Sequence, residues 1–322
     1  MEIAERNRYV LGKILEECAF SERWDNKTIK QLGSFYLSAM DTKKIDELKF
    51  EPIKEWARKI DEIKEKNELI SLISEFHRYG LEAMFSYSSD SDEKNSSIYA
   101  YYLEQGGLSL PNRDYYLLDS FESIRGYYKR HVANLFSLYG QSLQDAERSA
   151  ETVFEIELQL AKSSRTPVEL RDPERNYNRL MYEDLDRSIP SVGMRRYLSE
   201  IGLPDVKHIV IRQPEFFENL GKMLDSISLS EWKTYLTWKL LHFASPFLHE
   251  EVMKEYFALN FENFSIAVFF VSSVIQSNFL SFSLNASFRS DTISSILRLD
   301  SSVNSLSTYS FPSASPICPS IN

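Results

Sequence analysis

The sequence predicts a mainly α-helical lobe that contains one small β-hairpin, at about residues 84–104. Two observations support this prediction. Along most of residues 1–260, apolar side chains recur every three or four residues, in stretches that short polar connections separate. Only residues 84–104 change to an aromatic, extended pattern. Short amphipathic helices joined by short connections are typical of helical arrays.

The first two predicted helices cover residues 3–20 and 29–40, where apolar side chains recur at helical spacing. Asp41 can cap the short helix that follows, because its carboxylate can accept hydrogen bonds from free backbone N–H groups. Cys18 belongs to the apolar stripe of the first helix. We therefore expect it in the core and not as a reactive nucleophile.

Two more helices are predicted before the hairpin. Pro52 suits the first turn of one helix, because the N–H group that proline lacks would have no partner there. Asn67 can cap the next helix, which Gly80 ends.

The hairpin is predicted from residues 84–88 and 98–103, which are aromatic and extended in character. The polar run Ser89 to Ser97 between them is interpreted as the hairpin loop. The second strand leads to Gly106 and Gly107. Two adjacent glycines predict a turn in which one backbone segment closely approaches another.

Helices are expected to resume after the hairpin. One begins at Asp119 or Ser120 and ends near Gly140, and Ser142 with Asp145 resembles a capping box that starts the next. Their apolar faces repeat at helical spacing, which predicts that both pack against the core.

The following segment is more irregular. Residues 165–174 are charged and contain two prolines, which predicts a loop held by ion pairs. A short helix is expected around Met194, a short strand at residues 208–211, and a helix capped by Ser230 that contains Trp232.

Composition limits the class of protein. The chain has 322 residues, 43% of them hydrophobic, and a net charge of −10, which argues against nucleic acid or an anionic membrane surface as a partner. Cys18 and Cys318 are the only cysteines, so no disulfide framework is predicted. The first residues lack the apolar stretch of a secretory signal, and the sequence predicts no particular compartment.

Three strings resemble one known family. They are QGGLSLPNRDYYL at residues 105–117, RTPVELRDPERNYN at 165–178, and WKTYLTWKLL at 232–241. They are similar to the non-catalytic half of the neprilysin and endothelin-converting-enzyme family of zinc endopeptidases, bacterial branch. Ser109 stands where that family usually has glycine.

The resemblance implies a fold of two mostly helical lobes around a cavity, in which the lobe without zinc acts as a cap that limits substrates to peptides. Residues 1–260 correspond to an incomplete cap lobe, so the chain is interpreted as truncated. Two functions stay open. One is a segment of a peptide-hydrolysing zinc endopeptidase that is inactive alone. The other is a non-catalytic helical module that binds peptides or a partner, such as a separately encoded catalytic lobe.

The residues of a zinc endopeptidase site are not found. Two histidines one helical turn apart, with a glutamate beside the first, place both imidazoles on one face of a helix. The nearest string is residues 249–253, where Met253 stands in the position of the second histidine. His242 and His249 could share a helix face, but they lack a third ligand, and His131 lies on an apolar face. We therefore predict no catalytic, cofactor-binding or metal-binding residue in this chain, although zinc belongs to full-length family members.

The last part of the chain differs in composition. After about Asn260, serine dominates, mixed with apolar residues, and residues 261–322 are interpreted as a tail outside the family pattern. We expect this tail to be disordered, or to come from a shifted reading frame or from read-through of non-coding sequence. A genuine lineage-specific tail is the alternative. Residues 264–284 carry no charge and have about the length of a membrane span, but polar residues interrupt them, so no anchor is predicted.

Overall fold

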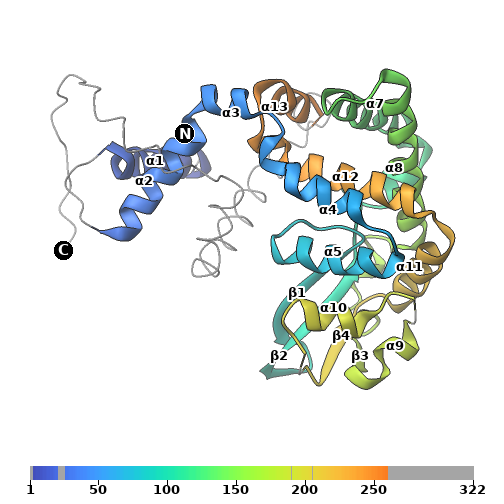
Figure 1. The fold of residues 1–322 in the computed structure, drawn as a ribbon. Helices are drawn as coiled ribbons and strands as arrows, with labels where there is room; N and C mark the ends of the chain where they lie inside the picture. The colour runs from blue at the N-terminus through green and yellow to red at the C-terminus, as the bar shows by residue number, and fades with distance from the viewer. Residues whose placement is uncertain (1–2, 21–25, 190, 205, 260–322) are drawn as a thin grey trace. The chain divides into compact units, whose positions relative to one another are not determined.

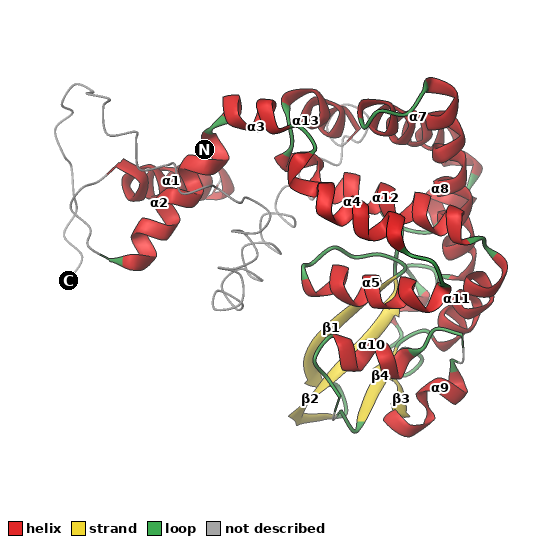
Figure 2. Ribbon diagram, viewed as in Figure 1, coloured by secondary structure: helices red, strands yellow, loops and turns green. Residues whose placement is uncertain are grey.

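A computed structural model of the chain describes residues 3–20, 26–189, 191–204 and 206–259. This part of the chain is mainly helical, as predicted, with one small sheet (Figures 1 and 2). The helices are α1 (Ile3–Phe20), α2 (Lys27–Met40), α3 (Thr42–Leu48), α4 (Lys54–Glu62), α5 (Lys66–Arg78), α6 (Asp114–Leu117), α7 (Glu122–Leu138), α8 (Leu143–Ser163), α9 (Leu185–Ser188), α10 (Met194–Glu200), α11 (Pro214–Ser226), α12 (Leu229–Ala244) and α13 (Glu250–Phe257). The strands are β1 (Phe85–Asp92), β2 (Asn95–Gln105), β3 (Asn178–Met181) and β4 (His208–Ile211).

The predicted hairpin is part of a four-stranded sheet with the order β1-β2-β4-β3. β1 pairs antiparallel with β2, β2 parallel with β4, and β3 antiparallel with β4. The prediction of a loop from Ser89 to Ser97 was wrong, because β1 extends to Asp92 and β2 begins at Asn95. Strand pairing supplies backbone hydrogen bonds to this polar segment, so its composition does not prevent it from being extended.

Local capping explains where several helices begin. The side chain of Asp41 accepts from the backbone N–H of Lys44, and that of Ser142 from Asp145, as predicted. Two predicted caps were wrong by two residues. Glu65, and not Asn67, precedes α5, and Ser228, and not Ser230, caps α12 in a capping box with its N3 glutamate.

Helices α1 and α2 pack against each other as a helical pair. Gly33 of α2 allows this contact, since a Cβ atom added there would lie 2.3 Å from the carbonyl oxygen of Cys18. The expectation that Cys18 lies in a core was wrong, because it is only partly buried in this pair. Its partial exposure follows from the two helices covering each other on one side only.

The hydrophobic core lies among helices α4, α5, α7, α8 and α10 to α12 and one face of the sheet. Its largest fully buried side chains are mostly aromatic and include Tyr128, Tyr197, Phe216, Trp232, Tyr235 and Trp238. Burying an aromatic side chain removes a large apolar area from water, at a few kcal/mol each. This core fixes α8 and α12 beside the end of β2, where the candidate site lies.

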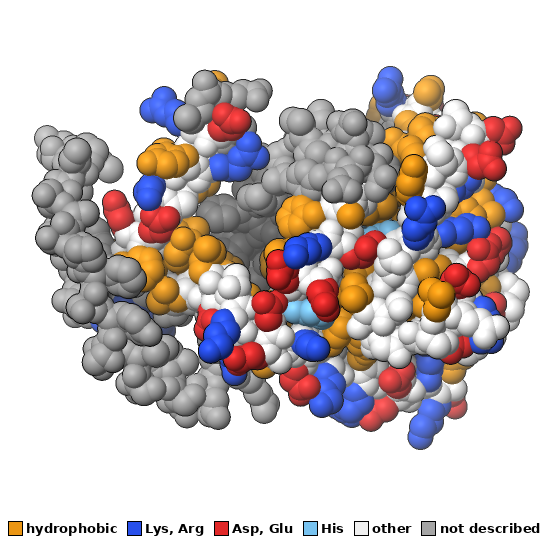
Figure 3. All heavy atoms as spheres, turned by 90° about the horizontal axis from the view of Figure 1, so that it is seen from above, with side chains coloured by type: hydrophobic (Ala, Val, Ile, Leu, Met, Phe, Trp, Pro, Cys, Tyr) orange, Lys and Arg blue, Asp and Glu red, His pale blue; other side chains and the backbone are white. Residues whose placement is uncertain are grey.

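Figure 3 shows charged side chains scattered among hydrophobic and uncharged ones on one face of the molecule. On this face, lysine and arginine are interspersed with aspartate and glutamate and do not gather in one basic patch. Among the described residues, no helix combines the length and the hydropathy needed to span a bilayer. The predicted tail, residues 261–322, lies outside the described residues, as do Cys318 and the uncharged stretch 264–284.

Candidate functional site

The glycine corner that follows β2 is built by close backbone contacts. A Cβ atom on Gly106 would lie 2.6 Å from the backbone nitrogen of Ser86, and one on Gly107 would lie 2.7 Å from the carbonyl oxygen of Met84. Gly107 also has a φ angle of +77°, which side-chain-bearing residues rarely adopt. The predicted close approach is confirmed, and it holds the corner against the start of β1.

Tyr235 of α12 holds this corner in place through two hydrogen bonds. Its hydroxyl donates to the carbonyl oxygen of Gly107 at 2.8 Å and accepts from the backbone N–H of Met84 at 3.0 Å. The ring is fully buried, and burial raises the pKa of its hydroxyl well above the usual value. Tyr235 therefore stays a neutral donor that connects the helical core with both ends of the hairpin.

A buried carboxylate lies under the segment that follows the corner. Glu157 of α8 has no exposed surface and accepts hydrogen bonds from three hydroxyls. Ser109 donates to Oε1 at 2.6 Å, Tyr116 to Oε2 at 2.9 Å, and Tyr128 to Oε2 at 2.5 Å. Burial raises the pKa of Glu157, while nearby Lys239 and the three hydroxyls act in the opposite direction.

Lys239 of α12 is the buried cation beside this carboxylate. Its Nζ lies 3.4 Å from the carbonyl oxygen of Leu108 and 3.3 Å from the hydroxyl of Ser109. Burial lowers the pKa of Lys239, and the negative charge of Glu157 offsets part of this shift. Trp238 also donates to the Ser109 hydroxyl, at 3.0 Å. The serine hydroxyl thus connects the anion, the cation and an indole.

The charged loop of residues 165–174 contacts the glycine corner through Gln105. Gln105 donates through its side-chain amide to the carbonyl oxygen of Arg165 at 3.1 Å and accepts from the Arg165 backbone N–H at 2.7 Å. The Arg165 guanidinium binds both carboxylate oxygens of Glu215 and also donates to Asn176. The ion pair predicted for this loop is confirmed. It fixes the loop against the N-terminal end of α11.

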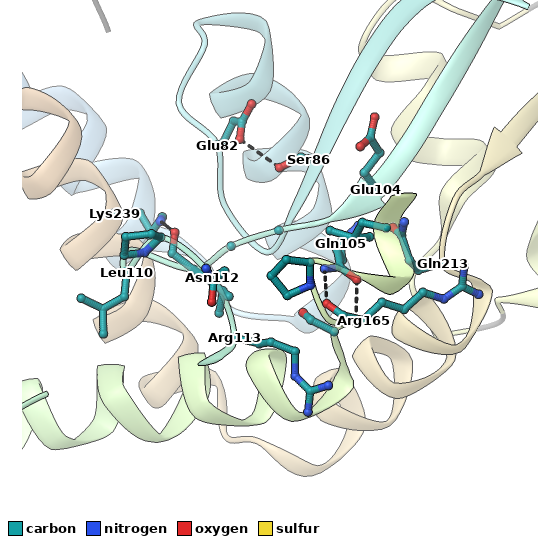
Figure 4. A pocket seen from close by; sticks show the side chains of 17 residues that line it. Glu82, Ser86, Glu104, Gln105, Leu110, Asn112, Arg113, Arg165, Gln213 and Lys239 are labelled. Carbon is teal, nitrogen blue, oxygen red and sulfur yellow. Dashed lines mark hydrogen bonds between the residues drawn. The ribbon is translucent and has the colours of Figure 1, made fainter. Parts of the chain in front are cut away.

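These elements enclose a cleft of about 300 Å³. Its lining includes the backbone from Gln105 to Leu108 and the side chains of Glu82, Ser86, Arg113 and Lys239, together with Pro167 and Leu170 of the charged loop. Figure 4 shows Glu82 beside Ser86 at one end of this view and Arg113 at the other, with Gln105 between them. The lining of the cleft therefore combines charged and polar side chains with the backbone of two glycines.

The histidines do not form a zinc site in the described part of the chain. His249 is the residue that precedes α13, with Met253 one turn later. The rings of His131 and His242 lie 6.4 Å apart between centroids, and Nδ1 of His131 contacts a carboxylate oxygen of Glu255 at 2.9 Å. Within residues 3–20, 26–189, 191–204 and 206–259, no group of three or more histidine, cysteine or acidic side chains could hold a metal ion. These residues do not fit the zinc of the resembling family.

Comparison with known proteins decides the family. The N-terminal domain model described as "Peptidase family M13" matches residues 1–265. The chain belongs to peptidase family M13. Endothelin-converting enzyme 1 of Bos taurus is 24% identical over 261 residues, and neprilysin-11 of Caenorhabditis elegans is 25% identical over 271 residues. Each match covers 76% of this chain, and 34% and 32% of the two relatives, so the chain spans about a third of their length.

Solved structures show the same fold as this M13 chain. The zinc metalloprotease Zmp1 of Mycobacterium tuberculosis, in complex with an inhibitor, matches with a TM-score of 0.76 and 22% identity, over 79% of this chain and 39% of that one. PepO of Lactobacillus rhamnosis matches with a TM-score of 0.62 and 13% identity, over 80% of this chain and 41% of that one. These matches confirm the predicted mainly helical lobe of a neprilysin-like protein.

Sequence reasoning missed the two buried charges of the site. The apolar spacing of α8 places Glu157 on the same face as Val153 and Leu160, both of which are fully buried. A carboxylate at a core position of a helical stripe is a signal that could have identified it. Lys239 gave a similar signal, because the apolar residues Trp238 and Leu240 flank it in the second half of α12, and both are buried.

Proposed function

We propose that this chain is the non-catalytic lobe of a peptide-hydrolysing metallopeptidase, and that it encloses peptides together with a separate catalytic lobe. The observation that carries the proposal is the match of residues 1–265 to the N-terminal domain of peptidase family M13, together with the shared fold. Its relatives include endothelin-converting enzyme 1 and a zinc metalloprotease. In this proposal, the chain hydrolyses no peptide by itself.

An apolar surface supports the proposal of a partner lobe. Helix α1 exposes several large apolar side chains, and α2 adds more beside it. These are Ile3, Tyr9, Val10, Leu11, Ile14 and Phe20 of α1, and Leu37 and Met40 of α2. These exposed side chains belong to one helical pair, and covering apolar surface is favourable because it releases water. We propose that the catalytic lobe covers this surface.

Co-expression tests this proposal. The full chain would be co-expressed with the remaining part of the Mycobacterium tuberculosis zinc metalloprotease, and the complex isolated through a tag on that part. The proposal predicts co-purification, and loss of it in Ile14→Glu, whose side chain is 47% exposed. Leu143→Glu on α8 is the matched control, because Leu143 is 67% exposed but lies outside the proposed surface. Absence of association, or equal loss in both variants, would contradict the proposal.

A further inference from the structure

Two segments that are far apart in the sequence meet where α13 begins. Figure 1 shows α3 beside α13, and the backbone N–H of Glu250 donates to Oδ1 of Asp46 at 2.9 Å. Next to this bond, the ring of His249 packs edge-to-face on Phe50, with the ring centroids 4.9 Å apart. We call these four residues the junction, because a hydrogen bond and a ring contact here join the end of α3 to the start of α13.

The junction connects the N-terminal helices with the core. Asp41 ends α2 and its side chain caps α3, so the two helices follow one another directly. Among the described residues, the buried core contains no residue before Ile53, and Phe50 packs against it. Lys49, between α3 and Phe50, has a φ angle of +49° and a ψ angle of −115°, which residues with a side chain rarely adopt. Such strain persists only where surrounding contacts hold it, and the junction supplies contacts on both sides of Lys49.

His249 is the titratable ring of the junction, and it is only 5% exposed. Its Nε2 faces the carboxylate of Glu251 at 3.9 Å, while its buried Nδ1 has no hydrogen-bond partner among the described residues. We therefore assign the proton of the neutral ring to Nε2. A second proton would have to bind at Nδ1, where no acceptor replaces the water that burial removes.

Other charged or titratable groups surround this ring. They are Asp46 and Lys49 on the side of α3, Glu250, Glu251 and Lys254 in α13, and Tyr139 at the end of α7. Burial has the largest effect and lowers the pKa of His249, and Lys49 acts in the same direction. Glu251 and Asp46 offset only part of this shift. The closed junction therefore favours the neutral imidazole.

We propose that His249 is a pH-sensitive switch, whose uncharged ring holds α3 against α13 at neutral pH and whose protonation in weak acid releases α3. The open junction binds the proton more tightly than the closed one. The contribution of His249 to closure is therefore complete above the ordinary histidine pKa of about 6.5 and is lost as the pH falls below it.

The switch needs no second lobe. One consequence does rest on the function proposed above, because the apolar surface of α1 and α2 would move with α3, and acid would then weaken association with the catalytic lobe. The two proposals fail separately, since release of α3 is measured on this chain alone.

Hydrogen exchange of the Glu250 amide, resolved by NMR on the full chain, tests the switch. This N–H is bonded to Asp46, so its exchange reports opening of the junction. After correction for the intrinsic exchange rate, we expect at least about threefold lower protection at about pH 5 than at about pH 7.5. The ordinary histidine pKa sets an upper limit of about 30-fold. His249→Phe keeps a ring against Phe50 and is expected to lose this pH response.

His208→Phe is the matched control, because it makes the same change in β4, outside the junction, and is expected to keep the pH response. Asp46→Ala removes the acceptor, so the Glu250 amide is expected to lose protection at both pH values, whereas Glu47→Ala at the next exposed position is expected to leave it unchanged. At the higher pH, the Glu250 amide is expected to be less protected than that of Leu236 in the core of α12, as local opening requires.

The proposal would be overturned by equal protection of the Glu250 amide at the two pH values, or by the same pH response in the wild type and in His249→Phe. Equal protection of Glu250 and Leu236 at the higher pH would also overturn it, because the junction would then open only when the whole chain unfolds.

Discussion

The hydroxyl of Ser109 lies 2.6 Å from Oε1 of Glu157 and donates to this buried carboxylate. The same hydroxyl accepts from Trp238 at 3.0 Å and lies 3.3 Å from Nζ of Lys239. The hydroxyl of Ser109 therefore lies at a point where a buried anion, a buried cation and an indole meet.

The first prediction concerns this hydroxyl. Ser109→Ala removes a donor from Glu157 and an acceptor from Trp238, and both of these partners are fully buried. We expect the free energy of unfolding to fall by about 1–3 kcal/mol, the cost of leaving buried polar groups unsatisfied. Urea denaturation measures the change. Ser123→Ala on the exposed side of α7 is the control, and equal midpoints for both variants would show that the hydroxyl network contributes nothing.

The second prediction concerns the carboxylate itself. Glu157→Gln removes the charge opposite Lys239 and places an amide N–H₂ group among hydroxyl donors. We expect a loss of about 1.5–3 kcal/mol, because three buried hydroxyl groups lose a charged acceptor. Glu155→Gln, two positions earlier on the exposed face of α8, should change the unfolding free energy by less than about 0.5 kcal/mol.

Combining the two substitutions provides a sharper test. Because Ser109 and Glu157 are in direct contact, the double variant should lose less stability than the sum of the single losses, by about 0.5–3 kcal/mol. Strict additivity in a double-mutant cycle would contradict a shared network.

The third prediction concerns the glycine corner. Gly107→Ala forces a Cβ atom to 2.7 Å from the carbonyl oxygen of Met84 at a φ angle of +77°. We expect a loss of at least about 1–3 kcal/mol, because the backbone cannot relax without moving β1. Gly126→Ala is the matched control. An added Cβ meets nothing within 4 Å there, and alanine in the middle of α7 should stabilise the helix by about 0.5–1 kcal/mol. Stabilisation by both variants would contradict the tight corner.

The fourth prediction concerns pH. Burial lowers the pKa of His242 to about 3, with smaller effects from Lys239 and His131, and its ring packs on Trp238 and Tyr256. In the unfolded chain histidine titrates near 6.5, so the unfolded state takes up the proton first as the pH falls. The contribution of His242 to stability is complete above pH 6.5 and declines by about 1.4 kcal/mol per pH unit towards pH 3.

His242→Phe removes the titratable imidazole and keeps an aromatic ring at this position. Near pH 7 the variant should differ from the wild type by less than about 1.5 kcal/mol, as for volume-conserving core changes. At pH 5 its stability relative to the wild type should rise by about 2 kcal/mol. Urea denaturation at both values measures this difference, and parallel pH profiles would show that His242 does not titrate as described.

The helical part of this fold could be predicted because its signals are local. Ser142 caps α8, the apolar stripe of α7 lies in the core, and Gly107 has a positive φ angle in the predicted turn. Each of these features depends on side chains within a few positions of one another. Local hydrogen bonds and helical spacing are therefore sufficient to identify them.

The sheet and the site could not be predicted in the same way, because they depend on distant partners. Residues 89–92 are polar and are extended because they pair with residues 95–101 of β2. The strand Asn178–Met181 was missed, since only its pairing with β4 defines it. Glu157 and Lys239 come together from α8 and α12, and no short-range pattern links two helices that are so far apart in the sequence.

In the function proposed above, this M13 chain forms a lobe that has no catalysis of its own. The most direct measurement is the zinc content of the purified full chain, by mass spectrometry of the metal, together with cleavage of a quenched fluorescent peptide. We expect less than stoichiometric zinc and no cleavage that a chelator abolishes. Stoichiometric zinc together with chelator-sensitive cleavage by the chain alone would contradict it.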